Sequence, residues 1–400
     1  MYIPSDEILR KYAGVMVNFA LRNGKWIKKW DTVFVYIPEC AKPFLIPLQE
    51  TILKSWWYPI IRYQPDGIAR NFYENASQEQ LEFMPKAYKE WEIESRTHTL
   101  SIIADADLHE LDGIEPSKIM SRIKANRPFR ELTNKKERDW KYSWTLCLYW
   151  TSAMAKEANL SEEEYRGQII KACFLDEENP VQKWREVNDM IQQKRDILTD
   201  MKIEYVHVVG PDEDLRVRIW WDRSRAAWRW CNIPSFEIFT SPDCRDINGR
   251  VRFNQPLYRY GNLIEWIELE FKDWFVVKAS AKKNDNILQD MIKIEWMTQV
   301  GEFSLTDART SKITKFMAET LFDENVWWQY GNTHIALGMA FDECYNGDKS
   351  KLDDSEFKKS IWLNMSAEHV DIISTANRTV TATLEDGSEK VIYENGMFTI

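Results

Sequence analysis

The first half of the chain alternates short apolar strands with helix-length amphipathic segments, and this alternation restricts the folds open to it. Strands rich in β-branched and aromatic residues are expected at 31–38, 58–63, 99–104 and 144–149. Helices are expected at 7–22, 43–55, 77–91, 116–138, 151–159, 161–175 and 180–198. Strands that alternate with helices of this length form βαβ units, so we predict an α/β N-terminal domain with a parallel sheet over residues 1–199.

The pattern changes near residue 200, where helices become rare. Six strand-like segments lie between residues 203 and 281, and helices return only at 283–294 and 311–321. Further strands are expected at 370–373, 379–384 and 390–393. Segregated strands and helices are typical of an α+β fold, so we predict an α+β C-terminal domain over residues 200–400.

Charge and composition exclude several classes of partner. The net charge of -10 argues against nucleic acid as a partner. No run of apolar residues is long enough to span a membrane, and the N-terminal residues lack the pattern of a signal peptide. The six cysteines contain no CxxC pair, which is typical of reduced thiols. These features predict a cytoplasmic protein without a disulfide framework.

One carboxylate lies within an apolar and hydroxylic stretch in the second half. We expect a strand at 234–240, on which alternation places Ser235, Glu237 and Phe239 on one face. A buried carboxylate is costly unless a cation meets it. Taken alone, the stretch favours a glutamate at a solvent-facing strand edge.

Two of the five histidines stand beside further carboxylates. His369 and Asp371 form an H-x-D on an expected strand, so both side chains point to one face and can bind one metal ion. His334 follows Glu324 by ten residues, and Glu302 follows Gly301. Single buried histidines are more often core residues than ligands, so each signal is weak alone. His98, His109 and His207 carry no such signal.

Taken together and in order, these motifs resemble the aminopeptidase T family of metallo-aminopeptidases. The motifs are IPSFEIFTSPD, GEFSL, FDEN, HIALG and HVD, and the likeness continues through NGRVRFNQPLYRYGNLIE, VVKASAKKN, GKWIKKWDTVFVYIPE and WTLCLYWTSAMAKEA. The resemblance covers essentially the whole chain. It implies peptide substrates with a free N-terminus and a homodimer.

The resemblance also implies a site for two divalent metal ions in the C-terminal domain. Its ligands would be Glu237, Glu302, His334, His369 and Asp371, with Glu324 a ligand or a contact of one. Carboxylate and imidazole ligands suit zinc, cobalt or manganese. Two such ions can polarise a peptide carbonyl and generate hydroxide at neutral pH. Glu302 is the candidate catalytic residue, which also moves the proton.

The chain departs from the family at one position. Seven residues after His334 the family carries a tyrosine, whose hydroxyl can hydrogen-bond the tetrahedral intermediate, and here that residue is Phe341. Tyr345 follows four residues later as a possible substitute. The departure weakens the prediction of full activity and leaves that of a metal site intact.

Two other functions fit part of the pattern. His334, His369 and Asp371 alone would form the two-histidine, one-carboxylate triad of a mononuclear iron oxygenase. Such a triad has no need of Glu237 or Glu302. A catalytically impaired binding protein is the second alternative, suggested by Phe341 and by the tryptophan content.

Tryptophan is abundant and glycine is scarce. The chain has 19 Trp and 14 Gly, whereas glycine is typically about 7% of residues. Asp273-Trp274 lies between two expected strands, where a tight hairpin favours Asp-Gly. Similar mismatches, mostly at loops where the resembling family carries glycine, occur at Trp26, Trp30, Trp56, Trp57, Trp150, Trp220, Trp221, Trp228, Trp230, Trp327, Trp328 and Trp362.

We interpret this distribution as a codon effect. Some bacteria read UGA as glycine, whereas a common alternative code reads it as tryptophan. Trp144 and Trp184, by contrast, fit ordinary aromatic positions. The alternative is an aromatic surface that binds glycans.

Overall fold

The computed structural model describes residues 4–21, 28–219, 223–224, 226–227, 231–243, 245–259 and 262–400. The chain forms two compact units, one of Met1–Arg185 with Arg229–Ile233 and one of Glu186–Trp228 with Pro234–Ile400. The division falls within helix α9 (Pro180–Asp200). The predicted domain boundary at 199/200 lies at the end of the same helix and stays a prediction.

The first unit is built on a parallel sheet of five strands in the order β2-β1-β3-β4-β8. The strands are β1 (Thr32–Pro38), β2 (Tyr58–Gln64), β3 (His98–Ile103), β4 (Ser143–Leu148) and β8 (Asn232–Ile233). The first four match the predicted strands. The fifth comes from the chain near residue 232, which the sequence assigned to the other domain.

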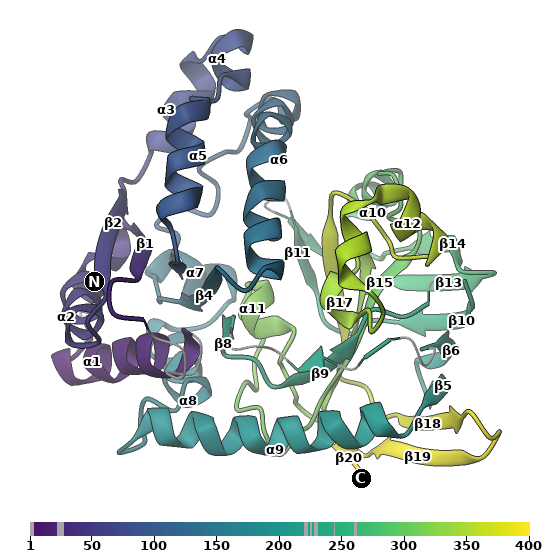
Figure 1. Cartoon of the computed structure of the whole chain (residues 1–400). Helices are drawn as coiled ribbons and strands as arrows, with labels where there is room; N and C mark the ends of the chain where they lie inside the picture. The colour runs from purple at the N-terminus through teal and green to yellow at the C-terminus, as the bar shows by residue number, and fades with distance from the viewer. Residues whose placement is uncertain are drawn as a thin grey trace. The chain divides into compact units, whose positions relative to one another are not determined.

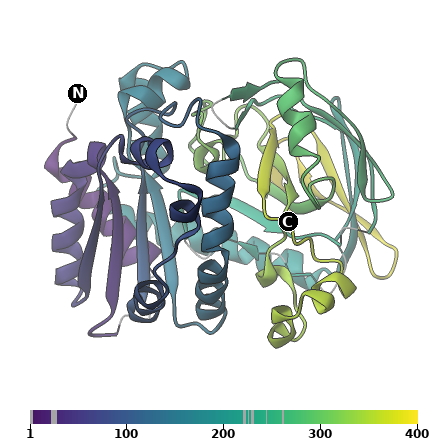
Figure 2. The same cartoon turned by 90° about the horizontal axis from the view of Figure 1, so that it is seen from above.

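Helices cover both faces of this sheet (Figure 2). They are α1 (Asp6–Gly14), the π-helix η1 (Val15–Ala20), η3 (Glu39–Phe44), α2 (Leu45–Lys54), α3 (Ile68–Asn75), α4 (Gln78–Glu82), α5 (Lys86–Ser95), α6 (Pro116–Arg138), α7 (Ser152–Glu157) and α8 (Glu162–Ala172). Side chains on both faces of strand β1 make contacts within the unit. Val33 and Val35 are buried on one face, while Tyr36 on the other donates a hydrogen bond to Glu92 of α5 at 2.9 Å.

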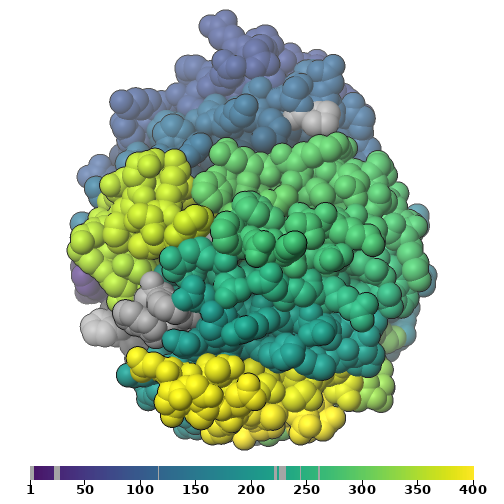
Figure 3. All heavy atoms as spheres, turned by 90° about the vertical axis from the view of Figure 1, so that its right-hand side faces the viewer, coloured from purple at the N-terminus to yellow at the C-terminus, as the bar shows by residue number. Residues whose placement is uncertain are grey.

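The second unit contains two antiparallel sheets and a short hairpin (Figure 1). The larger sheet has the order β14-β13-β10-β6-β5-β18-β19-β20. Its strands are β5 (Ile203–Gly210), β6 (Glu213–Arg218), β10 (Ile247–Arg252), β13 (Glu268–Lys272), β14 (Phe275–Ser280), β18 (Thr379–Leu384), β19 (Glu389–Glu394) and β20 (Met397–Phe398). Figure 3 shows the C-terminal strands (yellow) alongside the chain of β5 and β6 (teal).

The smaller sheet positions the site and has the order β17-β16-β15-β9-β7. Its strands are β7 (Ala226–Ala227), β9 (Glu237–Thr240), β15 (Val300–Thr306), β16 (Asn332–Gly338) and β17 (His369–Ser374), and β11 (Leu257–Arg259) pairs with β12 (Asn262–Ile264). The remaining short helices are α10 (Asp285–Met291), α11 (Thr320–Asp323), η4 (Asp342–Cys344), η5 (Lys349–Asp353) and α12 (Ser355–Ser360). The prediction of a parallel α/β half followed by an α+β half is confirmed.

Three local predictions were wrong. The helix expected at 311–321 is reduced to the single turn of α11, because 311–319 form loops. The strand expected at 234–240 begins at Glu237. The helix expected at 77–91 is divided, since α4 ends at Glu82 and α5 begins at Lys86.

The turn between β13 and β14 has positive φ at a tryptophan, a conformation that this residue disfavours. Lys272 pairs with Phe275, so the turn residues are Asp273 and Trp274, with φ of 48° and 71°. A two-residue turn with positive φ at both positions favours Asn-Gly or Asp-Gly. The loop joining β18 to β19 meets the same requirement with Gly387, whose φ is 80°. Trp274 therefore occupies a backbone conformation suited to glycine.

Among the described residues, no helix is long and apolar enough to cross a bilayer.

Candidate metal centre

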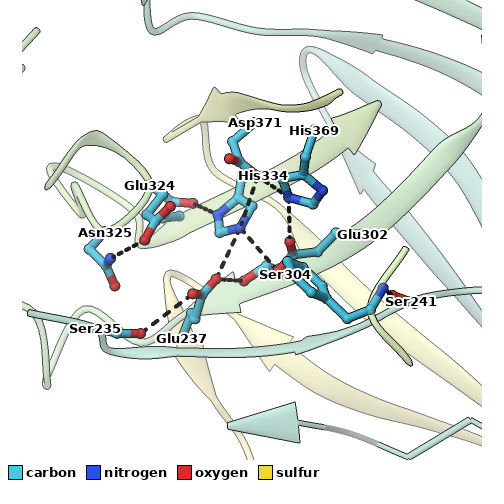
Figure 4. A network of polar contacts seen from close by, with 12 residues as sticks. Ser235, Glu237, Ser241, Glu302, Ser304, Glu324, Asn325, His334, His369 and Asp371 are labelled. Carbon is cyan, nitrogen blue, oxygen red and sulfur yellow. Dashed lines mark hydrogen bonds and ion pairs between the residues drawn. The ribbon is translucent and has the colours of Figure 1, made fainter. Parts of the chain in front are cut away.

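Four adjacent strands of the smaller sheet carry the polar side chains of the site. The antiparallel register pairs Glu237 of β9 with Thr306 of β15, and Ser304 of β15 with His334 of β16. It also pairs Ala336 with both Glu302 and Asp371, and Gly338 with His369. Because alternate side chains share a face, these residues project to one side of the sheet. Their carboxylates and imidazoles converge there (Figure 4).

The first group of potential ligands is Glu237, Glu302 and His334, and all three are buried. Nε2 of His334 lies 3.0 Å from Oε2 of Glu237 and 3.6 Å from Oε1 of Glu302. Ser304 donates a hydrogen bond of 2.7 Å to Glu237 Oε2, which fixes that carboxylate. One atom from each residue lies within 4.8 Å of the others, close enough to surround one metal ion.

The second group is Glu302, His369 and Asp371. Nε2 of His369 lies 3.0 Å from Oε2 of Glu302 and 3.2 Å from Oδ1 of Asp371. Glu302 thus belongs to both groups, and it directs a different oxygen to each. A carboxylate between two ligand sets can bridge two ions.

Glu324 lies beside these groups and is a member of neither. It follows α11 directly and is 7% exposed. Asn325 donates to its Oε1 at 3.4 Å, so an amide side chain already holds the carboxylate (Figure 4). Of the six predicted site residues, the structure therefore brings five into two tight groups and leaves Glu324 at their edge.

In both histidines of the site, Nδ1 contacts an oxygen atom, while Nε2 faces the carboxylates. Nδ1 of His369 donates to the backbone carbonyl of Met339 at 2.7 Å, and Nδ1 of His334 lies 3.3 Å from Oδ1 of Asn332. A partner at Nδ1 sets the orientation of the ring and directs Nε2 toward the carboxylates. This is the arrangement that metal-binding histidines usually show.

Burial and mutual charge shift the pKa values of the group. Burial raises the pKa of Glu237, and burial together with the charges of Glu237 and Asp371 raises the pKa of Glu324 well above its usual value. Burial alone would lower the pKa of His334, but the charge of Glu237 and its hydrogen bond raise it well above its ordinary value. Without a metal ion, the protonated imidazole therefore offsets part of the carboxylate charge.

The donor set fits divalent metal ions. Four buried carboxylates lie around two imidazoles, and Oδ1 of Asp371 is buried with Nε2 of His369 3.2 Å away. Burial would raise the pKa of Asp371, but the charge and hydrogen bond of His369 lower it to about 2, so this carboxylate is ionised. An ionised, buried carboxylate among other carboxylates is suited to a cation, and oxygen and imidazole ligands suit zinc, cobalt or manganese.

Phe341 contributes an apolar wall. Its ring centre lies 4.9 Å from that of His369 and 5.4 Å from that of Phe239. Tyr345 lies elsewhere, because its ring packs on Phe357 at 6.0 Å in the cluster of Ala340, Leu352 and Leu363. Tyr345 therefore does not replace the hydroxyl that Phe341 lacks.

Three residues of the site were not predicted. Ser304 and Asn332 each lie two positions from a predicted ligand on the same strand, so strand alternation would have identified both. Asn325 follows Glu324 in a turn, where no periodicity indicates which way a side chain points. Its contacts depend on tertiary packing alone.

Comparison with known proteins decides the family. The model of the thermophilic metalloprotease family (M29) matches residues 5–398. The chain belongs to this family. Family membership confirms the predicted resemblance and the prediction of a metal-dependent enzyme that cleaves peptide bonds.

Relatives of this M29 chain extend over its full length. Aminopeptidase PepS of Streptococcus thermophilus is 27% identical to this chain, and the alignment covers 100% of both proteins. Aminopeptidase T of Thermus thermophilus is 26% identical, with 96% of this chain and 98% of the relative covered. The solved structure of wild-type AmpT from Thermus thermophilus shares the fold with a TM-score of 0.82, 24% identity, and coverage of 99% of this chain and 100% of that one.

Proposed function

We propose that this M29 protein is an aminopeptidase whose site holds two divalent metal ions. The position of Glu302 carries the proposal. Its two oxygens lie 3.6 Å from Nε2 of His334 and 3.0 Å from Nε2 of His369, between two sets of potential ligands. Glu237 and His334 would hold one ion, His369 and Asp371 the other, and Glu302 would contact both. Glu324 would complete the site as a ligand or as a contact of one.

Zinc, cobalt or manganese would supply Lewis acidity that polarises a peptide carbonyl and makes water more acidic. The protein's own side chains would move the proton, orient the ligands and exclude water. Glu302, as the carboxylate between the two sets, would accept a proton from the attacking water and return it to the leaving amine. His334 and His369 keep Nε2 directed inward through their Nδ1 contacts. Phe341 excludes water beside His369 and offers no hydroxyl to the transition state.

The substrate class follows from the relatives, which are named aminopeptidases. We propose that this chain also removes residues from peptides with a free N-terminus. The homodimer and the cytoplasmic location remain predictions, which sedimentation and cell fractionation test.

The decisive experiment combines metal counting with hydrolysis of a leucine anilide. We expect two ions per chain by elemental mass spectrometry, with release that depends on added zinc, cobalt or manganese. Glu302→Gln keeps the shape of the side chain and removes its charge, so release should fall by at least about a hundredfold. Glu92→Gln is the matched control, because Glu92 is a buried carboxylate in the first unit.

The alternatives predict other results. A single bound iron per chain, with no anilide release, would favour the oxygenase. Peptide binding without hydrolysis by the metal-loaded protein would favour the binding protein. Neither is favoured by membership of a metalloprotease family.

A further inference from the structure

The turn that carries Glu324 is held by the side chain of Asn325. This side chain is fully buried. Its Oδ1 accepts the backbone N–H of Phe236 at 2.7 Å, just before β9 and Glu237. Its Nδ2 donates to the carbonyl of Leu321 at 3.3 Å and to Glu324 Oε1 at 3.4 Å. Asn325 thus connects the turn with the chain that leads to Glu237, and Figure 4 shows its contact with the carboxylate of Glu324.

Asn332 holds the same turn from the other side. It is also fully buried, two residues before His334 on β16. Its Nδ2 donates to the carbonyls of Val326 at 2.9 Å and Asp323 at 3.4 Å. Because the amide nitrogen is used in this way, Oδ1 is the atom that faces Nδ1 of His334 at 3.3 Å, as an acceptor.

We propose that Asn325 and Asn332 are positioning residues that dock the Glu324 turn onto β9 and β16. Asn332 also selects the form of His334 that carries a proton on Nδ1 and presents Nε2 to the metal site. The inference rests on the proposed function, since it assigns these two amides to the assembly of that site. Neither residue touches the reacting atoms.

The choice of amide side chains has a physical reason. Each position requires donors and an acceptor on one short side chain, which an amide supplies and a carboxylate does not. A carboxylate at either position would also add negative charge to a site that holds four buried carboxylates. Alanine would leave buried carbonyls and Nδ1 of His334 without a partner.

The test measures cobalt affinity by titration in wild type, Asn332→Ala and Asn325→Ala. Loss of groups that hold metal ligands typically weakens metal affinity about ten- to a hundredfold, and we expect that range here. Asn364→Ala is the matched control. Asn364 is equally buried, and its Nδ2 donates to the carbonyls of Trp296 and Gln299, away from the ligands. The control should lose stability and keep its cobalt affinity.

A second readout does not depend on metal. Amide hydrogen exchange of the metal-free chain should be faster at Phe236 in Asn325→Ala and across 323–326 in Asn332→Ala, with both segments unchanged in the control. Asn332→Asp retains an acceptor for His334 and loses the donor to the turn. This variant should therefore keep the ring orientation, seen by ¹⁵N shifts of the five histidines, but exchange faster at the turn.

The outcomes separate this inference from the proposed function. A wild-type chain that takes up no cobalt would overturn the proposed function, and the positioning role with it. Tight binding by wild type and equally tight binding by Asn332→Ala and Asn325→Ala would overturn the positioning role alone. Wild-type exchange at the turn in Asn332→Asp would exclude docking through Nδ2.

A separate observation carries a second inference, which concerns the tryptophans. Seven of the fourteen described non-glycine residues with positive φ are tryptophan. They are Trp30 (86°), Trp56 (64°), Trp140 (58°), Trp266 (57°), Trp274 (71°), Trp296 (68°) and Trp362 (55°). Positive φ is uncommon outside glycine, and the exceptions are usually Asn or Asp.

Unpaired indole nitrogens also indicate that several of these positions do not suit tryptophan. Buried indole N–H groups usually find an acceptor, yet Nε1 of Trp57, Trp150, Trp274 and Trp327 is buried with no hydrogen-bond partner among the described residues. Trp144 and Trp184 do find one, since they donate to Glu137 at 3.0 Å and to the carbonyl of Cys173 at 3.2 Å. These two are the tryptophans that the sequence marked as ordinary aromatic positions.

We infer that the natural chain carries glycine at these ten positions, through a codon that its organism reads as glycine. The expectations at Trp26, Trp220, Trp221, Trp228 and Trp230 lie outside the described residues. UGA codons at the ten positions and UGG at Trp144 and Trp184 would support the inference, and UGG at Trp274 would overturn it. Peptide mass spectrometry of the protein from its own organism should identify glycine there, and tryptophan would refute it.

Discussion

The ring of Phe341 lies with its centre 4.9 Å from the ring of His369, at the edge of the candidate metal centre. An apolar ring at this point shields the imidazole and offers no hydrogen-bond donor. The relationship locates the departure from the family pattern at the site itself. Tyr345 packs in a separate cluster and does not compensate.

Phe341→Tyr should therefore raise the rate of peptide hydrolysis. A donor aimed at the oxyanion is worth about a hundredfold or more in kcat when it is well placed, and a restored hydroxyl should recover at least about tenfold. The measurement is kcat for a leucine anilide with saturating metal. Phe357→Tyr is the control, because Phe357 packs in the cluster of Tyr345. An unchanged kcat in Phe341→Tyr would show that the hydroxyl does not reach the transition state.

Removal of metal should lower the thermal stability of the protein. Four buried carboxylates repel one another, and protonated histidines offset only part of that charge. A ligand at a hundred times its Kd stabilises the folded state by about 2.7 kcal/mol. Calorimetry with and without a chelator should show a fall in Tm that added zinc or cobalt reverses. Equal Tm values would count against a bound ion.

Ser304→Ala should weaken metal binding without unfolding the chain. Ser304 is buried and donates to Glu237 at 2.7 Å, so its loss frees a carboxylate that the site holds in place. We expect metal affinity to fall about tenfold or more. Ser374→Ala provides a comparison, since Ser374 is a buried serine that donates at 3.2 Å to the buried carboxylate of Glu213, which belongs to neither ligand group. Equal affinities for the two variants would contradict the role of Ser304.

Stability should fall in acid as Asp307 becomes protonated. Burial would raise the pKa of Asp307, but hydrogen bonds from Arg309 and Lys194 lower it to about 2. A carboxyl whose pKa is lower in the folded state stabilises the fold above its unfolded pKa, near 4, and this contribution disappears as the pH falls toward 2. The shift corresponds to about 2 kcal/mol. Urea unfolding of wild type and Asp307→Asn at pH 6 and pH 3 checks this. The free energy of unfolding of wild type should exceed that of the variant at pH 6, and the difference between them should be smaller at pH 3.

Glu213→Gln should be among the most destabilising single changes in the second unit. Glu213 accepts a hydrogen bond of 2.7 Å from Nε of Arg378, and both side chains are buried. Removing one partner leaves a buried charge unpaired, at a cost of about 3–5 kcal/mol. Chemical denaturation measures the loss, with Glu385→Gln as an exposed comparison, since Glu385 pairs with Lys202 at the surface. A loss below about 1 kcal/mol would show that Arg378 finds another partner.

Much of the first unit was predictable, because the local sequence pattern of each strand and helix indicates its type. Segments such as 31–38 are continuous and apolar, and the helices between them are long enough to enforce parallel pairing. The short strand β8 was not predictable. Two residues carry no periodic signal, and only their pairing with β4 makes them part of that sheet.

The sequence by itself indicated which residues can serve a metal site, because five motifs in order resemble those of the aminopeptidase T family, although residue type and alternation gave only a weak signal for each residue. Only the tertiary structure decided how they meet. The register of β9, β15, β16 and β17 sets Glu302 between His334 and His369, and it leaves Glu324 on a turn beside them. Register depends on contacts between segments distant in the chain, and a shift of one residue would turn every one of these side chains to the opposite face.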